Sequence, residues 1–143
     1  MGEVFSCKIL DSNSNSNRIQ QLKDYLKVFP PIYKNASIQK FLWKCEFSLM
    51  CGKKAIKKND IVYASGSIFR SAMCLIYVLY AANEMYCINE KGSLDRVIKK
   101  DNVVLPRNFQ ETIEKTISID KNNLSAAFYE MDKLYSTIND MFD

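Results

Sequence analysis

The sequence predicts an all-α protein, an up-and-down antiparallel bundle of about five helices. Glycine and proline are scarce, with 4 and 3 among 143 residues, which argues against a turn-rich β-sandwich. Apolar residues recur at spacings of three and four over most of the chain, as they do on one face of a helix. Only VFSCKIL, residues 4–10, alternates at period two, so we expect at most a short strand remnant before the bundle.

The length of the chain fits a single domain with a substantial core. We divide it into an N-terminal extension and linker over residues 1–17 and a helical bundle domain over residues 18–143. The division follows DSNSNSN at residues 11–17, a polar stretch without a core-forming residue. The first helix of the bundle comes after this linker and ends at the proline pair of residues 30–31.

Two long helices are expected next. The first covers about residues 35–58 and carries a second apolar stripe, Trp43, Phe47 and Met50, which predicts contacts on two sides. The next begins at Asp60, a residue type that caps helix N-termini well. Three further helical segments follow: SLDRVIKK at residues 93–100, a helix around residues 109–117 and a last helix that begins near Asn122 or Asn123.

Composition excludes several kinds of chemistry. The chain has no histidine, which rules out His-based acid–base catalysis, Ser-His-Asp triads and His metal sites. The five cysteines are an odd number without a C-x-x-C pair, which favours reduced, buried thiols in a cytoplasmic protein over disulfides or a zinc site. The net charge of +4 permits an acidic partner but does not require one.

Neither a membrane nor a nucleic acid is an expected partner. The uncharged run from Ser71 to Asn83 has 13 residues, whereas a helix that spans a membrane needs about 20. An apolar helix of this length is typical of a protein core. The KKAIKK run at residues 53–58 has no interleaved aromatic residue, so it indicates a solvated helix end rather than a nucleic-acid patch.

One long stretch resembles a known family. Residues 41–92, from FLWKCEF to the NEKG turn, resemble the C-terminal helical domain of bacterial nucleotidyltransferases of the kanamycin nucleotidyltransferase type. The upstream ILDSNS and the Phe-Pro-Pro before residue 32 extend the likeness. The resemblance is carried by Phe41-Leu42-Trp43, the Lys-Asn-Asp turn before Ile61, Phe69-Arg70, Ala82-Asn83 and Asn89-Glu90-Lys91-Gly92.

The resemblance implies that nucleotide binding and acceptor binding belong to different domains. In the family an N-terminal polymerase-β-like domain carries a Gly-Ser turn and paired carboxylates that bind Mg²⁺ and the nucleoside triphosphate. This chain has no Gly-Ser turn followed by a D-x-D strand, so it resembles the helical half alone. We therefore expect no cofactor in this chain, with Mg²⁺ and the triphosphate bound only by a catalytic domain in cis or in trans. The helical domain is expected to help form the acceptor cleft and to support a homodimer.

A second reading is a free-standing helical protein of the HEPN type, which pairs with a minimal nucleotidyltransferase in toxin–antitoxin operons. Ribonuclease members of that family need an Arg followed a few residues later by His. Here Arg70 is followed by SAMCLIY, and the chain contains no histidine. This reading therefore predicts a partner protein without ribonuclease activity.

The resemblance implies a general base at Glu46, because a Glu on the first long helix after the linker activates the acceptor hydroxyl in the kanamycin enzyme. Such a base needs hydrogen-bond reach to the acceptor and a pKa near the working pH, which partial burial could supply. The alternative is a surface carboxylate paired with a cation one helical turn away. No cation stands at that spacing within the helix, which favours a more specific role.

The remaining candidates are substrate-binding residues. Arg70 is the one charge in the middle of its helix and shares a face with Tyr63. It either has a structural role, in an ion pair or as a cap on a neighbouring helix end, which we favour, or contacts substrate. The polar turn after that helix either ends it, with Gly92 adopting an unusual backbone angle, or forms a rim of the acceptor cleft. The substrate-binding candidates are Tyr63, Arg70, Asn83, Asn89, Glu90 and Lys91.

The short turn between the two long helices predicts their relative height. The helices must be antiparallel neighbours, which places Glu46 level with residues 70–72. The NEKG turn lies about a dozen residues further on, roughly 18 Å away at about 1.5 Å per residue. We therefore expect Arg70 to lie nearer to Glu46 than the turn does. As functional candidates we rank Glu46 first, Arg70 second and the turn third.

Overall fold

The computed structural model describes the backbone of residues 1–10 and 14–142 and the side chains of residues 1–10 and 17–142. Within these ranges the chain forms seven helices and no strand, which confirms the all-α class. The helices are α1 (Gly2–Ser6), α2 (Ser14–Leu26), α3 (Pro31–Ile56), α4 (Ile61–Ala82), α5 (Ser93–Ile98), α6 (Phe109–Ile117) and α7 (Leu124–Asn139).

The N-terminal segment is helical where the sequence predicts a strand remnant. Residues 2–6 form α1, and the Cys7 backbone N donates to the carbonyl O of Glu3 at 2.9 Å. A strand needs a neighbouring strand to pair its backbone groups, and the described part of the chain contains none. A helical turn pairs those groups within the segment itself, so it prevails over the period-two pattern of residues 4–10.

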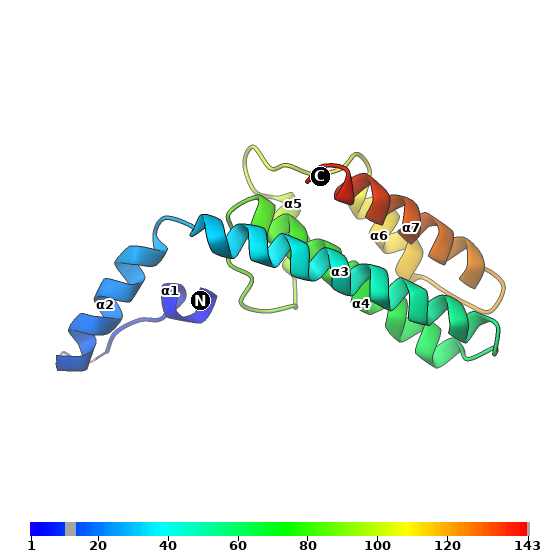
Figure 1. The fold of residues 1–143 in the computed structure, drawn as a ribbon, viewed down its shortest axis with the longest axis horizontal. Helices are drawn as coiled ribbons and strands as arrows, with labels where there is room; N and C mark the ends of the chain where they lie inside the picture. Colours follow the sequence, from blue (N-terminus) through cyan, green and yellow to red (C-terminus); the bar gives the residue numbers. More distant parts are fainter. Residues whose placement is uncertain (11–13, 143) are drawn as a thin grey trace.

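The predicted linker at residues 11–17 has two parts. Residues 11–13 lie outside the described residues, whereas residues 14–17 form the first turn of α2. α2 packs on α1, and Figure 1 shows the two at the N-terminal end, beyond the paired α3 and α4. The hydroxyl of Tyr86 donates to the carbonyl O of Leu26 at 3.1 Å and ties the end of α2 to the rest of the protein.

α3 and α4 form an antiparallel pair along the length of the protein (Figure 1). α3 begins at Pro31, because proline is tolerated in the first turn of a helix, where its missing N–H would have no partner. The chain reverses between Ile56 and Ile61, and Asp60 Oδ1 accepts a hydrogen bond from the Tyr63 backbone N at 3.0 Å. The predicted N-cap is thereby confirmed.

α4 is the central helix, since α3, α5, α6 and α7 all pack on it. By length and composition it is also the one helix of the described residues that could cross a membrane. Of its most apolar window, 56% is buried inside the protein. The core helix of a soluble protein passes the same test, so this property is weak evidence for a membrane.

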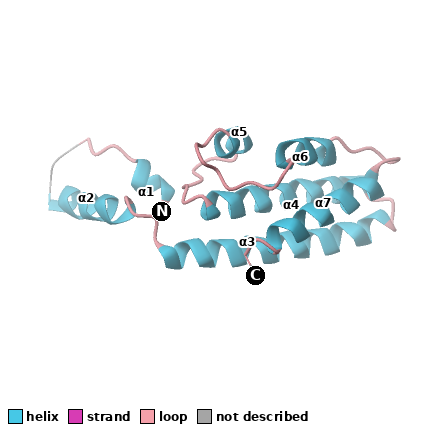
Figure 2. Ribbon diagram, turned by 90° about the horizontal axis from the view of Figure 1, so that it is seen from above, coloured by secondary structure: helices cyan, strands magenta, loops and turns pink. Residues whose placement is uncertain are grey.

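The C-terminal helices complete the core. Figure 2 shows α5 and α6 on the opposite side of α4 from α3, and α7 packs on both α3 and α4. The helices approach closely at Gly52 of α3, where an added Cβ would lie 2.7 Å from Ser67 Cβ and closer still to the Phe128 ring. Three helices therefore meet at a residue with no side chain.

Candidate functional site

An open groove of about 450 Å³ lies between α3 and α4, and we call it the α3–α4 groove. Its volume is within the range of small-molecule sites. Both helices line it with side chains spaced three, four or seven residues apart, which share one helical face. Its principal lining residues are Phe41, Lys44, Ser48 and Cys51 of α3, Tyr63, Arg70, Cys74 and Tyr77 of α4, and Glu90 of the loop that follows.

Arg70 is exposed at this groove rather than buried. Its Nη2 donates to Ser67 Oγ at 3.1 Å, and its guanidinium lies 5.4 Å from the centroid of the Tyr63 ring. None of the ion pairs among the described residues includes Arg70. The structural ion pair or helix cap that the sequence favours is therefore not found among the described residues, and the guanidinium is held by one hydroxyl and one ring.

Glu90 reaches the other end of the α3–α4 groove from the loop after α4. The hydroxyl of Tyr77 donates to Glu90 Oε1 at 2.9 Å, and the Tyr77 ring lies 4.7 Å from that of Phe41. Burial, together with the hydrogen bond to the Glu90 carboxylate, raises the pKa of the Tyr77 hydroxyl. Tyr77 therefore stays protonated and holds the carboxylate in place.

Cys74 lies inside the groove with 8% of its surface exposed. Burial raises the pKa of its thiol, and the nearby charges of Lys44 and Arg70 offset part of this rise. A protonated, buried thiol is a packing group rather than a nucleophile. All five cysteines of the chain are free.

Glu46 lines a different groove, between α3 and α7, of about 660 Å³. We call it the α3–α7 groove. Glu46 shares its helical face with Lys53, seven residues on, and Lys53 Nζ forms an ion pair with Asp132 Oδ2 of α7 at 2.5 Å. Glu46 itself is exposed. The structure therefore places Glu46 and Arg70 on opposite flanks of α3 rather than in one groove.

Asn83 is buried and lines neither the α3–α4 groove nor the α3–α7 groove. Its side-chain amide is hydrogen-bonded to the backbone of Val104 and to the carbonyl O of Leu79. Asn89 Oδ1 accepts from the Lys91 backbone N at 2.9 Å, which closes a local turn. Of the seven candidates, the structure brings together Tyr63, Arg70 and Glu90 in the α3–α4 groove, and it does not bring Glu46, Asn83, Asn89 or Lys91 there.

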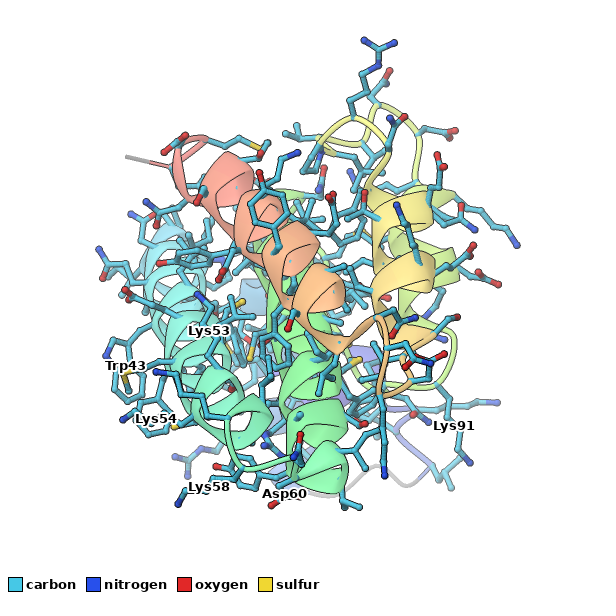
Figure 3. The ribbon with its side chains drawn as sticks, turned by 90° about the vertical axis from the view of Figure 1, so that its right-hand side faces the viewer. Trp43, Lys53, Lys54, Lys58, Asp60 and Lys91 are labelled. Carbon is cyan, nitrogen blue, oxygen red and sulfur yellow. The ribbon has the colours of Figure 1, made fainter. Side chains whose placement is uncertain are left out.

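Gly92 has the unusual backbone angle that the sequence predicts, but the NEKG turn does not end α4, which stops at Ala82; the turn instead leads into α5. Gly92 has a φ of 66°, the left-handed region in which glycine is unstrained. Arg96 Nη2 donates to the carbonyl O of Asn89 at 2.6 Å and closes the loop on α5. Figure 3 shows Lys91 far from Trp43, on the opposite side of the protein.

The second apolar stripe of α3 is exposed, so the contact on that side that the sequence predicts is not made by the described residues of this chain. Trp43, Phe47 and Met50 are 62%, 48% and 45% exposed, and we call them the α3 ridge. The Trp43 and Phe47 rings stack at 5.5 Å with an interplanar angle of 13°. Figure 3 shows Trp43 projecting away from the other helices. Trp43 and Phe47 border both grooves, whereas Met50 borders only the α3–α7 groove.

Sequence reasoning missed the α3 wall of the α3–α4 groove. Phe41, Lys44, Ser48 and Cys51 recur at spacings of three and four, and this pattern was a usable signal. It was hidden because apolar residues occupy more than one face of α3. A group of three or more Cys, Asp or Glu side chains able to hold a metal ion does not occur within the described ranges.

Comparison with family models, characterised proteins and solved structures gives no match for this chain. The assignment of function therefore rests on the geometry of the site and on the motifs of the sequence.

Proposed function

We propose that this chain is the substrate-binding and dimerising helical domain of a nucleotidyltransferase, with α3, α4, α6 and α7 as its up-and-down bundle. The observation that supports it best is the α3–α4 groove, which gathers Tyr63, Arg70 and Glu90 at one open site. A catalytic domain, in cis or in trans, supplies the Mg²⁺ and the nucleoside triphosphate. The helical domain holds the acceptor beside it.

The acceptor lies in the α3–α4 groove in this proposal. Aromatic rings provide its walls, and Arg70 provides donors that no carboxylate of the described residues occupies. Glu90 is the carboxylate that borders this groove, whereas Glu46 borders the α3–α7 groove. The base that activates the acceptor is therefore Glu90 for an acceptor in the α3–α4 groove, or Glu46 for one that also enters the α3–α7 groove.

Dimerisation uses the α3 ridge. An exposed, contiguous apolar patch is a usual mark of a contact surface, and a second copy of the chain would remove it from water. The free thiols fit a reducing compartment, and we place the protein in the cytoplasm.

Co-purification tests the proposal. The full chain is expressed together with the nucleotidyltransferase catalytic domain encoded nearest to it, and the catalytic domain carries the affinity tag. We expect the chain to be retained, and the variant Arg70→Gln to be retained equally, because Arg70 faces the acceptor. A catalytic domain encoded upstream in the same reading frame supports the proposal as stated. Retention by a minimal nucleotidyltransferase from a separate neighbouring gene favours the HEPN-type partner, and failure to retain the chain contradicts both.

A further inference from the structure

We propose that the α3–α4 groove takes a small amphipathic anion, with an aromatic or other apolar body and one carboxylate or similar acidic head. The head binds between Lys44 and Arg70, and the body lies along the aromatic wall of the groove. The inference rests on the proposed substrate-binding role of this groove and gives the chemical class of its ligand.

The two cations that border the groove are not neutralised by an ion pair with any described residue. Lys44 and Arg70 both border it, and neither belongs to any ion pair among the described residues. Arg70 uses one donor on Ser67, which leaves most of its five N–H groups for a ligand. Lys44 Nζ lies 6.0 Å from the centroid of the Phe41 ring. Two free cations at the rim of an apolar groove attract an acidic group and disfavour an amine.

Lys44 and Arg70 both influence the thiol of Cys74, although they come from different helices. Lys44 belongs to α3 and Arg70 to α4, and the charges of both lower the pKa of the Cys74 thiol against the effect of burial. Cys74 lines the same groove. An anion above Cys74 would therefore meet both positive charges at once.

The opposite end of the groove is negative, which orients the ligand. Glu90 is held there by the Tyr77 hydroxyl at 2.9 Å. Arg70 and Tyr77 are two helical turns apart, or roughly 10 Å along α4. An acidic head is repelled from the Glu90 end and attracted to the Arg70 end, so the apolar body has one favourable direction. A volume of about 450 Å³ suits one aromatic ring with a short chain.

The sole tryptophan of the chain provides the test, because Trp43 borders the groove. The full chain is titrated with phenylbutyrate and with phenylbutylamine, which share an aromatic body and carry opposite charges, and the fluorescence of Trp43 is recorded. We expect saturable binding of phenylbutyrate and about fivefold weaker binding of the amine. Added salt should reduce the difference, because these cations are exposed.

Variants locate the site. Lys44→Gln and Arg70→Gln should each remove most of the preference for the carboxylate, whereas Lys91→Gln, at an exposed cation outside the groove, should leave it unchanged. Far-UV circular dichroism verifies that each variant is folded. Equal or tighter binding of the amine overturns the inference and leaves the groove as an acceptor site of another class. A lack of saturable response to either compound also overturns it, and the co-purification experiment decides the proposed function separately.

Discussion

The side chain of Asn83 pairs with both backbone polar groups of Val104. Asn83 Nδ2 donates to the Val104 carbonyl O at 3.0 Å, and the Val104 backbone N donates to Asn83 Oδ1 at 2.6 Å. Nδ2 also donates to the carbonyl O of Leu79 at 2.8 Å. Asn83 is 6% exposed, and Val104 belongs to the loop between α5 and α6. The Asn83 amide supplies the hydrogen bonds that another backbone segment would otherwise provide, and it anchors that loop at the end of α4.

Replacement of Asn83 by Ala should destabilise the protein by about 2–4 kcal/mol, because it leaves the backbone groups of Val104 unpaired in a part-buried position. Urea unfolding followed by circular dichroism measures the change. Asn89→Ala is the matched control, since Asn89 is exposed and its side chain bonds only the Lys91 backbone N in its own turn, and it should cost less than about 1 kcal/mol. Equal effects of the two substitutions would contradict the anchoring role.

The two helical glycines Gly52 and Gly66 should respond in opposite directions to substitution by alanine. A Cβ at Gly52 would collide with Ser67 and Phe128, and overpacking of this kind costs roughly 1–3 kcal/mol, more than the gain in helix propensity. A Cβ at Gly66 would meet only the guanidinium of Arg70, at 3.2 Å, which a flexible side chain can relieve. Thermal unfolding should show a lower Tm for Gly52→Ala and an unchanged or higher Tm for Gly66→Ala. A stable Gly52→Ala would show that the three helices do not meet there as described.

The more deeply a cysteine is buried, the more slowly its thiol should react. Burial raises the pKa of Cys45 and Cys74 above the ordinary value of 9.0, so at pH 8 the folded protein holds little thiolate at either position. Alkylation by iodoacetamide, read by mass spectrometry, should modify Cys51, which is partly exposed, well before Cys45 and Cys74. Rapid modification of Cys45 in the folded protein would contradict its burial.

The same pKa shifts predict loss of stability at alkaline pH. The folded-state pKa of Cys74 is raised, so the unfolded chain releases this proton first. The contribution to stability is complete below about pH 9, the ordinary thiol pKa, and is lost as the pH rises toward the folded-state value. Urea unfolding at a series of pH values should show this decline, and Cys74→Ala should reduce its slope.

Self-association should depend on the α3 ridge. Met50→Glu places a charge in the patch and should weaken the dimer by about tenfold or more in sedimentation analysis. Ile117→Glu is the matched control, because Ile117 of α6 is 43% exposed, close to the 45% of Met50, and lies on another element. A monomeric parent chain at high concentration, or equal effects of the two variants, would contradict dimerisation through the ridge.

Much of the fold could be predicted from the sequence because its signals are local. The 3.6-residue period marked the long helices, Asp60 marked the start of α4, and Gly92 marked the turn that needs a positive φ. Residues 2–6 were not predicted as a helix, because a short segment can match the strand pattern by chance and only pairing distinguishes the two.

The sequence predicts which residues of α3 and α4 lie at the same level along the helix pair, but it does not predict which groove each side chain faces. The short turn after α3 set which residues of α3 and α4 lie level, since the chain must reverse there. Which flank of α3 a side chain occupies depends on where α7 packs, and α7 is far away in the sequence. Glu46 therefore lines the groove between α3 and α7 rather than the one that contains Arg70. Similarly, the partner of Asn83 is a backbone group of Val104, which no side-chain pattern reveals.

Nucleotidyl transfer tests most directly the claim that this chain supplies the acceptor side of a nucleotidyltransferase and not its catalytic side. Radiolabelled ATP, Mg²⁺ and a small-molecule cell extract are incubated with the chain alone, with the nucleotidyltransferase catalytic domain alone, and with both. We predict no transfer by the chain alone, transfer when both are present, and a marked decrease with Arg70→Gln. Mg²⁺-dependent transfer by the purified chain alone, or transfer by the catalytic domain that is unaffected when the chain is omitted, would contradict the account.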